Sequence, residues 1–156
     1  MAYYRDLSRF RYESGLLHGG LSVGWLTWWL PYRRGRAPEG FPAALLDLCM
    51  GPKAVQHRGL HYCPFCFRWR QGSPIRLRHD GREALLGGSI VAVRHPDGTI
   101  FAAPDLICHY VEIHRYLPPA KFIEAVLDWK KGLEAVEAPA GSTPNLRGRE
   151  DRPGAR

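Results

Sequence analysis

Short runs of apolar residues alternate with turn signals along most of this chain, and three of the runs have helical spacing. In FPAALLDLCM (41–50) the apolar side chains, Cys49 among them, recur every three or four positions. APDLICHYVEIHRY (103–116) is predicted to open a second helix at Pro104, because proline suits the first helical turn. PAKFIEAVLDWKKG (119–132) repeats the spacing and predicts a third helix.

Two hairpins are predicted between the first and second helices. SPIRLRHDGREALLG (73–87) turns at Asp80-Gly81, and SIVAVRHPDGTIFAAP (89–104) turns at Asp97-Gly98. Asp-Gly supplies the positive φ that tight hairpin turns require. The alternating pattern of the second hairpin predicts one buried face, made of Ile90, Ala92, Ile100 and Ala102.

These elements predict a single α+β domain over residues 1–135. We expect a small antiparallel sheet, formed by the two hairpins, with about three helices packed against it. LSVGWL (21–26) is predicted as a further short strand in which Gly24 marks a close backbone approach. Residues 136–156 are rich in Pro, Gly and charge, so they are predicted to be a disordered tail.

Composition places the chain among ordinary globular proteins. Of its 156 residues, 45% are apolar and 24% are charged, and no apolar run is long enough to span a membrane. The opening MAYYRDLSRFRYESG lacks the apolar segment of a secretory signal, so we expect a cytoplasmic protein with no membrane association. The net charge of +7 favours acidic or nucleic-acid partners.

Four residues have the spacing of a structural zinc site. Cys63 and Cys66 are separated by two residues in HYCPFCF, and His109 and His114 by four in CHYVEIH. Zinc prefers four thiolate or imidazole ligands in a tetrahedron. Positions five apart diverge on an ideal helix, so both rings converge only if the last turn near His114 loosens. The cysteine turn is followed by the two hairpins and then by the helix with the histidines. This order resembles an enlarged zinc finger and predicts a Cys2His2 site for Zn²⁺.

Other interpretations of the same residues stay open. Cys63 and Cys66 are also compatible with buried thiols beside ordinary helix histidines, or with a redox pair, although FRWRQGSP behind them lacks the helix that a thioredoxin-like motif opens. His61 and Cys108 are reserve ligands for the zinc site. Cys49 is interpreted as a small core residue.

A zinc-dependent hydrolase is a further alternative, because Glu112 lies between the two histidines. The spacing differs from the H-E-x-x-H pattern, which places both histidines on one helix face. Two thiolates and two imidazoles would also fill the tetrahedron and leave no position for water. The pattern therefore favours a structural metal and an exposed role for Glu112.

An aromatic, arginine-rich stretch is the remaining candidate for function. WWLPYRRGR combines large stacking surfaces with cations, and its candidate contact residues are Trp28, Trp29, Arg33, Arg34 and Arg36. It is compatible with a partner surface for protein or single-stranded nucleic acid. The alternative is that one or two of the tryptophans, Trp25 included, cover the core and the arginines form a solvated turn.

The chain also resembles a known group of proteins. YYRDLS, VGWL, PEGF, HYCPFC, FAAPDLICHY and HYVEIHRYLPPAKFIEAV occur in that order over about residues 1–130. Together they resemble a family of small bacterial proteins of unknown function, common in high-GC actinobacteria. The resemblance implies that the two cysteines and two histidines belong together, and it implies no activity. WLTWWLPYRRGRA departs from the shorter, less aromatic connection expected of the family.

Taken together, these patterns predict a zinc-stabilised, non-enzymatic binding or adaptor protein. A protein partner is expected ahead of nucleic acid, and nucleic-acid binding and zinc-dependent hydrolysis are the alternatives. Binding that is insensitive to salt would exclude the nucleic-acid alternative.

Overall fold

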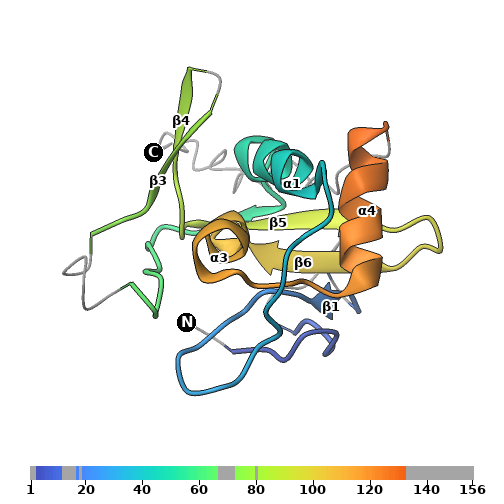
Figure 1. Ribbon diagram of the computed structural model, residues 1–156, viewed down its shortest axis with the longest axis horizontal. Coiled ribbons are helices and arrows are strands. Elements are labelled where there is room, and N and C mark those ends of the chain that lie inside the picture. Colours follow the sequence, from blue (N-terminus) through green and yellow to red (C-terminus); the bar gives the residue numbers. More distant parts are fainter. Residues whose placement is uncertain (1–2, 12–16, 18, 67–72, 80, 133–156) are drawn as a thin grey trace, which may run out of the picture.

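The computed structural model confirms the predicted α+β class (Figure 1). It describes residues 3–11, 17, 19–66, 73–79 and 81–132; the predicted tail, 136–156, lies outside the described residues. The helices are α1 (Phe41–Met50), α3 (Ile107–His114) and α4 (Ala120–Lys130). The strands are β1 (Leu21–Ser22), β2 (Val55–Gln56), β3 (Arg76–His79), β4 (Arg82–Leu85), β5 (Ser89–Arg94) and β6 (Ile100–Pro104). None of the helices in this described part is long and apolar enough to cross a membrane.

The main sheet is mixed, whereas the sequence pattern predicts only antiparallel pairs. Its strand order is β1-β6-β5-β2, and β1 runs parallel to β6 while the other neighbours are antiparallel. The first predicted hairpin, β3–β4, forms a separate two-stranded sheet. The predicted strand 21–26 pairs as a strand only over its first two residues, because the backbone turns at Gly24, where φ is +73°. A Cβ at Gly24 would lie 2.8 Å from Cδ1 of Ile107, which explains the glycine at this close approach.

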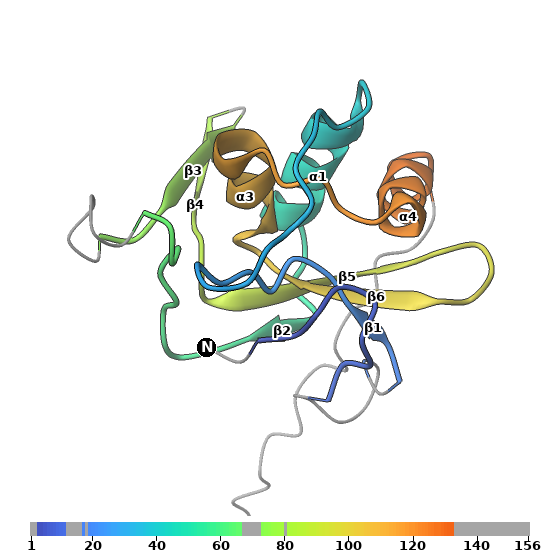
Figure 2. The ribbon, with the colours of Figure 1, turned by 60° about the horizontal axis from the view of Figure 1, so that its bottom comes forward.

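Both faces of the main sheet are buried. Figure 2 shows α1, α3 and α4 on one face and the N-terminal segment against the other. Of the predicted face, Ile90, Ala92 and Ala102 are confirmed as buried and pack with Phe10 and Trp25 of the N-terminal segment, whereas Ile100 is only partly buried. The opposite face is buried as well, under the helices, through Val91, Val93, Phe101 and Ala103. A sheet that is covered on both faces needs apolar residues at nearly every position. The alternating pattern of the hairpin therefore predicted only one of its two buried faces.

The second helix begins three residues later than the sequence pattern predicts. Pro104 is the last residue of β6, where it pairs with Ile90, and α3 starts at Ile107. The ladder with β5 holds this stretch extended, so Pro104 cannot open a helix. Asp105 is fully buried and its Oδ1 accepts a hydrogen bond of 2.7 Å from the amide of Gly87. Its role is to satisfy a buried backbone donor rather than to stabilise a helix terminus.

The N-terminal segment is attached to the connection between α3 and α4 by one carboxylate. Oδ1 of Asp6 accepts a hydrogen bond of 2.9 Å from the amide of Gly24. Oδ2 accepts a bond of 2.7 Å from the hydroxyl of Tyr116, which is fully buried. Burial and the nearby Asp6 charge raise the pKa of Tyr116 well above its usual range. These contacts fix the chain that leaves α3, directly after the last predicted ligand.

Candidate metal centre

The segment that carries the cysteine pair is attached to the edge of the main sheet. After β2, the amide of His57 donates to the carbonyl of Gly88 and the amide of His61 donates to the carbonyl of Gly87, each over 2.7 Å. Gly87 has a φ of +100°, and a Cβ there would lie 2.0 Å from the carbonyl oxygen of His61. Only glycine allows the two backbones to approach so closely, so Gly87 positions the approach to Cys63.

The cysteine pair forms a tight turn with Cys63 in its interior. The amide of Cys66 donates to the carbonyl of Cys63 over 3.2 Å, and Cys63 is 2% exposed. Burial raises the pKa of the Cys63 thiol to about 12, although the backbone amides of Cys66 and Phe65 bond to the sulfur and act in the opposite direction. Burial thus disfavours the Cys63 thiolate, and a divalent cation bound to the sulfur would offset this desolvation cost.

The two histidines extend from α3, and its C-terminal turn brings their rings together. His114 is the last residue of the helix, and Arg115 follows in the left-handed conformation with φ at +55°. The amides of Arg115 and Tyr116 both donate to the carbonyl of Tyr110, so the final turn is wider than a regular α-helical turn. The Nε2 atoms of His109 and His114 lie 3.2 Å apart. The turn thereby brings together two rings that diverge on an ideal helix.

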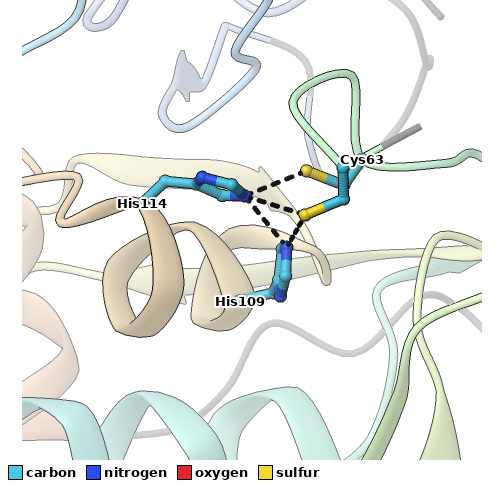
Figure 3. Close-up of side chains that lie close together, drawn as sticks. Cys63, His109 and His114 are labelled. Carbon is cyan, nitrogen blue, oxygen red and sulfur yellow. Dashed lines mark hydrogen bonds between the residues drawn. The ribbon is translucent and has the colours of Figure 1, made fainter. Parts of the chain in front are cut away.

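The four side chains converge on one point, and Figure 3 shows the imidazoles directed at the sulfurs. Nε2 of His114 lies 3.3 Å from Sγ of both Cys63 and Cys66, and Nε2 of His109 lies 3.5 Å from Sγ of Cys66. All four ligand atoms lie within 4.8 Å of one another. Zinc bonds of about 2.0–2.3 Å place tetrahedral ligand atoms about 3.3–3.8 Å apart. The four separations of 3.2–3.5 Å are close to this range, so the cluster could hold a tetrahedrally coordinated metal ion.

Comparison with known proteins assigns the chain to a family. A family described as Domain of unknown function (DUF7919) matches residues 2–127. The chain belongs to this family. No curated protein and no solved structure matches the chain. The matched region of the DUF7919 family contains all four residues of the cluster, and it confirms the resemblance to a family whose function is unknown.

Aromatic side chains enclose the cluster on one side. The Phe65 ring lies 4.9 Å from the His114 ring and 5.3 Å from that of Tyr32, whose hydroxyl donates to the carbonyl of His114 over 3.3 Å. Burial, with a smaller contribution from the charge of Arg34, lowers the pKa of His114 and favours the neutral imidazole that metals bind. Phe65, Tyr32 and Gly87 were not predicted as positioning residues from the sequence. Of these three, only Gly87 could have been found from its neighbours in the sequence, because a Gly-Gly pair before a strand indicates an unusual backbone conformation or a close approach.

The two reserve ligands lie outside the cluster. His61 is held through its backbone at Gly87, and burial lowers its pKa. Cys108 is buried and its thiol donates to the carbonyl of Asp105 over 3.2 Å. The thiol of Cys49 raises the pKa of Cys108 well above its usual range. Cys49 is fully buried in the core, as predicted. Neither reserve residue belongs to the group of ligand atoms that could hold a metal.

Glu112, the candidate base of the hydrolase alternative, is exposed and lies on the rim of two pockets. A pocket of about 210 Å³ is lined by Cys66, His109 and Glu112 together with residues of the β3–β4 hairpin. It is smaller than the roughly 300–1,000 Å³ of ordinary ligand sites. A larger pocket, of about 940 Å³, lies between α1, α3 and the loop before α1, and none of the four cluster residues lines it.

The aromatic, arginine-rich stretch lies directly beside the cluster. Residues 33–35 run alongside the chain that follows α3: the amide of Gly35 donates to the carbonyl of Arg115, and the amide of Leu117 donates to the carbonyl of Arg33. Trp25 is buried in the core, where its Nε1 donates to the carbonyl of Ala102 over 3.3 Å. Trp28 and Trp29 are exposed. The interpretation that one tryptophan covers the core thus applies to Trp25.

Proposed function

We propose that this protein is a zinc-stabilised, non-enzymatic binding module. The convergence of two sulfurs and two imidazole nitrogens supports this function: four pairs of these atoms lie 3.2–3.5 Å apart, close to the edge lengths of a zinc tetrahedron, and all four atoms lie within 4.8 Å of one another. Two thiolates with two neutral imidazoles form a borderline-soft donor set that suits zinc. The charge of Zn²⁺ would balance the Cys63 thiolate, which burial otherwise disfavours by raising its pKa.

A structural role for the metal is supported by the completeness of the ligand set. Four protein ligands occupy all positions of the tetrahedron, whereas catalytic zinc sites keep one position open for water. The adjacent pocket of about 210 Å³ gives little room for a substrate. Both observations weigh against the hydrolase alternative, in which Glu112 would act as the base.

The metal would stabilise the fold by connecting parts that are distant in the sequence. Cys66 and His109 are 43 positions apart, and both hairpins lie between them. Zinc would close this loop and offset the entropy that otherwise favours the unfolded chain. The cysteine segment joins the sheet edge through only a few backbone contacts, so we expect its placement to depend on the metal.

The origin, the cellular compartment and the partner of the protein can be proposed as well. We propose a bacterial, cytoplasmic protein that binds a macromolecular partner. The resemblance to bacterial proteins supports the first point, and the four free cysteines support a reducing compartment. Exposed tryptophans, in the stretch whose Tyr32 contacts the metal centre, support a partner surface.

Metal content and stability test this proposal directly. We expect one zinc per chain in the purified protein, a tetrahedral Co²⁺ absorption spectrum after exchange, and a large fall in melting temperature after chelation. Cys63→Ser and His109→Ala should each lose the metal. Cys108→Ser and His61→Ala, which change the same residue types outside the cluster, should retain it. A wild-type protein without bound metal, or unchanged metal content in both cluster variants, would refute the proposal.

A further inference from the structure

The stretch Trp28–Arg36, hereafter the aromatic–arginine segment, exposes more apolar surface than the fold requires. Trp28 is 70% exposed, Trp29 is 53% exposed and Leu30 is 41% exposed. Large exposed apolar groups that are contiguous in this way indicate a contact surface rather than part of the core. The segment contains three arginines and no acidic residue.

The exposed tryptophans meet through their edges. The rings of Trp28 and Trp29 have centroids 5.3 Å apart at an interplanar angle of 88°, and the Tyr3 ring meets Trp29 at 4.6 Å and 71°. A parallel stack would bury a whole face of each ring, whereas this arrangement leaves much of both indoles exposed. Accessible indole faces stack with nucleobases of any sequence.

The three arginines follow the tryptophans on an ordered stretch of backbone. Arg33, Arg34 and Arg36 are exposed, and none of them forms a salt bridge with a described residue. Hydrogen bonds from Gly35 to Arg115 and from Leu117 to Arg33 hold this backbone in place. The guanidinium of Arg34 lies 4.8 Å from the centre of the Tyr32 ring. The backbone that carries the three arginines is therefore ordered, and their positive charges lie close together in the sequence at exposed positions.

We propose that the aromatic–arginine segment binds single-stranded nucleic acid, with bases stacked on Trp28 and Trp29 and phosphates paired with Arg33, Arg34 and Arg36. A positively charged track beside aromatic platforms is the common arrangement of single-strand binders. Nine residues span at most about 30 Å when fully extended, and the turn at Trp28–Leu30 makes this segment shorter, so it would contact only a few nucleotides. The chain's net charge of +7 attracts the same class of partner from a distance.

This inference specifies what the proposed module binds, and it rests on that proposed function. Tyr32 joins the segment to the metal centre through the carbonyl of His114 and the ring of Phe65. The described surface favours nucleic acid over the protein partner expected from the sequence, because the arginines have no acidic neighbour within the segment and the two most exposed apolar side chains, Trp28 and Trp29, are flat aromatic rings.

Fluorescence anisotropy with a labelled oligothymidylate of about 15 nucleotides, within the range of single-strand binding sites, tests the proposal. We expect the zinc-loaded protein to bind it. Changing Trp28→Ala and Trp29→Ala together should weaken binding at least about tenfold. Changing both to tyrosine should preserve most of the affinity. Changing Arg33, Arg34 and Arg36 to glutamine should reduce the slope of log affinity against log salt by about 2.

A charge-matched control separates specific contacts from net charge. Changing Arg9, Arg58 and Arg94 to glutamine removes the same charge from exposed positions elsewhere and should leave the affinity within about twofold. Equal losses in the two triple variants, no binding by wild type, or equal displacement by polyglutamate would overturn the inference. Zinc content measured on the same samples separates the two proposals: zinc-loaded protein that fails to bind refutes this inference alone, whereas protein without zinc refutes the proposed function.

Discussion

The hydroxyl of Tyr32 donates a hydrogen bond to the carbonyl of His114 across 82 positions of sequence, over 3.3 Å. The same ring contacts Phe65, which lies between the two cysteines. One side chain therefore touches both halves of the candidate metal centre and belongs to the aromatic–arginine segment. Through it, changes at the metal centre would reach the proposed binding surface.

Replacing Tyr32 tests this connection. Tyr32→Phe keeps the ring and removes the hydrogen bond, so we expect the unfolding free energy to fall by about 0.5–1.5 kcal/mol. Tyr32→Leu also loses the contact with Phe65 and should cost more. Urea denaturation of the zinc-loaded proteins measures both values. If Tyr32→Phe and Tyr32→Leu match wild type in stability, Tyr32 does not support the centre.

Gly87→Ala should be among the most damaging single changes in the chain. The new Cβ would lie 2.0 Å from the carbonyl oxygen of His61, and φ at this position is +100°. Backbone strain and displacement of the cysteine segment together should lower the unfolding free energy by about 3 kcal/mol or more and weaken metal binding.

Gly98→Ala is the matched control for this change. Gly98 also has a positive φ, of +89°, but its Cβ would meet nothing within 4 Å. We expect it to cost only about 1–2 kcal/mol from strain and to leave metal affinity unchanged. Denaturation and zinc titration of the two variants measure the difference. Equal effects would show that the approach of Gly87 to His61 is not what positions the cysteines.

His95 should make stability depend on pH through the end of the β5–β6 hairpin. Hydrogen bonding to Asp97 is the main cause that raises the pKa of His95, burial opposes it, and Glu124 of α4 adds a smaller upward effect. Nδ1 lies 2.8 Å from Asp97 and Nε2 lies 3.4 Å from Glu124. Lys121 of α4 pairs with the other oxygen of Asp97.

The sign of the effect follows from the raised pKa. The stabilisation is fully present below about pH 6.5, the ordinary value for histidine, and it is lost as pH rises through the higher folded-state value. We expect the difference in unfolding free energy between wild type and His95→Asn to shrink as pH rises above about 6.5. Loss of metal at low pH affects both proteins and cancels in this difference. A difference that stays constant, or grows with pH, would contradict the assignment.

The elements with strong local signals could be predicted from the sequence. The bounds of α1 followed from the spacing of the apolar residues in 41–50. The turn of the β5–β6 hairpin followed from Asp97-Gly98, and Gly98 has the expected positive φ. The start of α3 was predicted wrongly because Pro104 is a good first helical residue, while its pairing with Ile90 across the sheet is invisible locally.

The sequence by itself determined which residues have metal-binding chemistry and in what order they occur: two thiols in a tight turn, two hairpins, then two imidazoles on one helix. These are properties of spacing and residue type, which are local. Only the tertiary structure decided that all four ligand atoms converge and that Tyr32 and Gly87 hold the parts in place. It also decided that β1 pairs in parallel with β6. Such contacts join residues that are tens of positions apart, and they form only when the core of the whole domain packs.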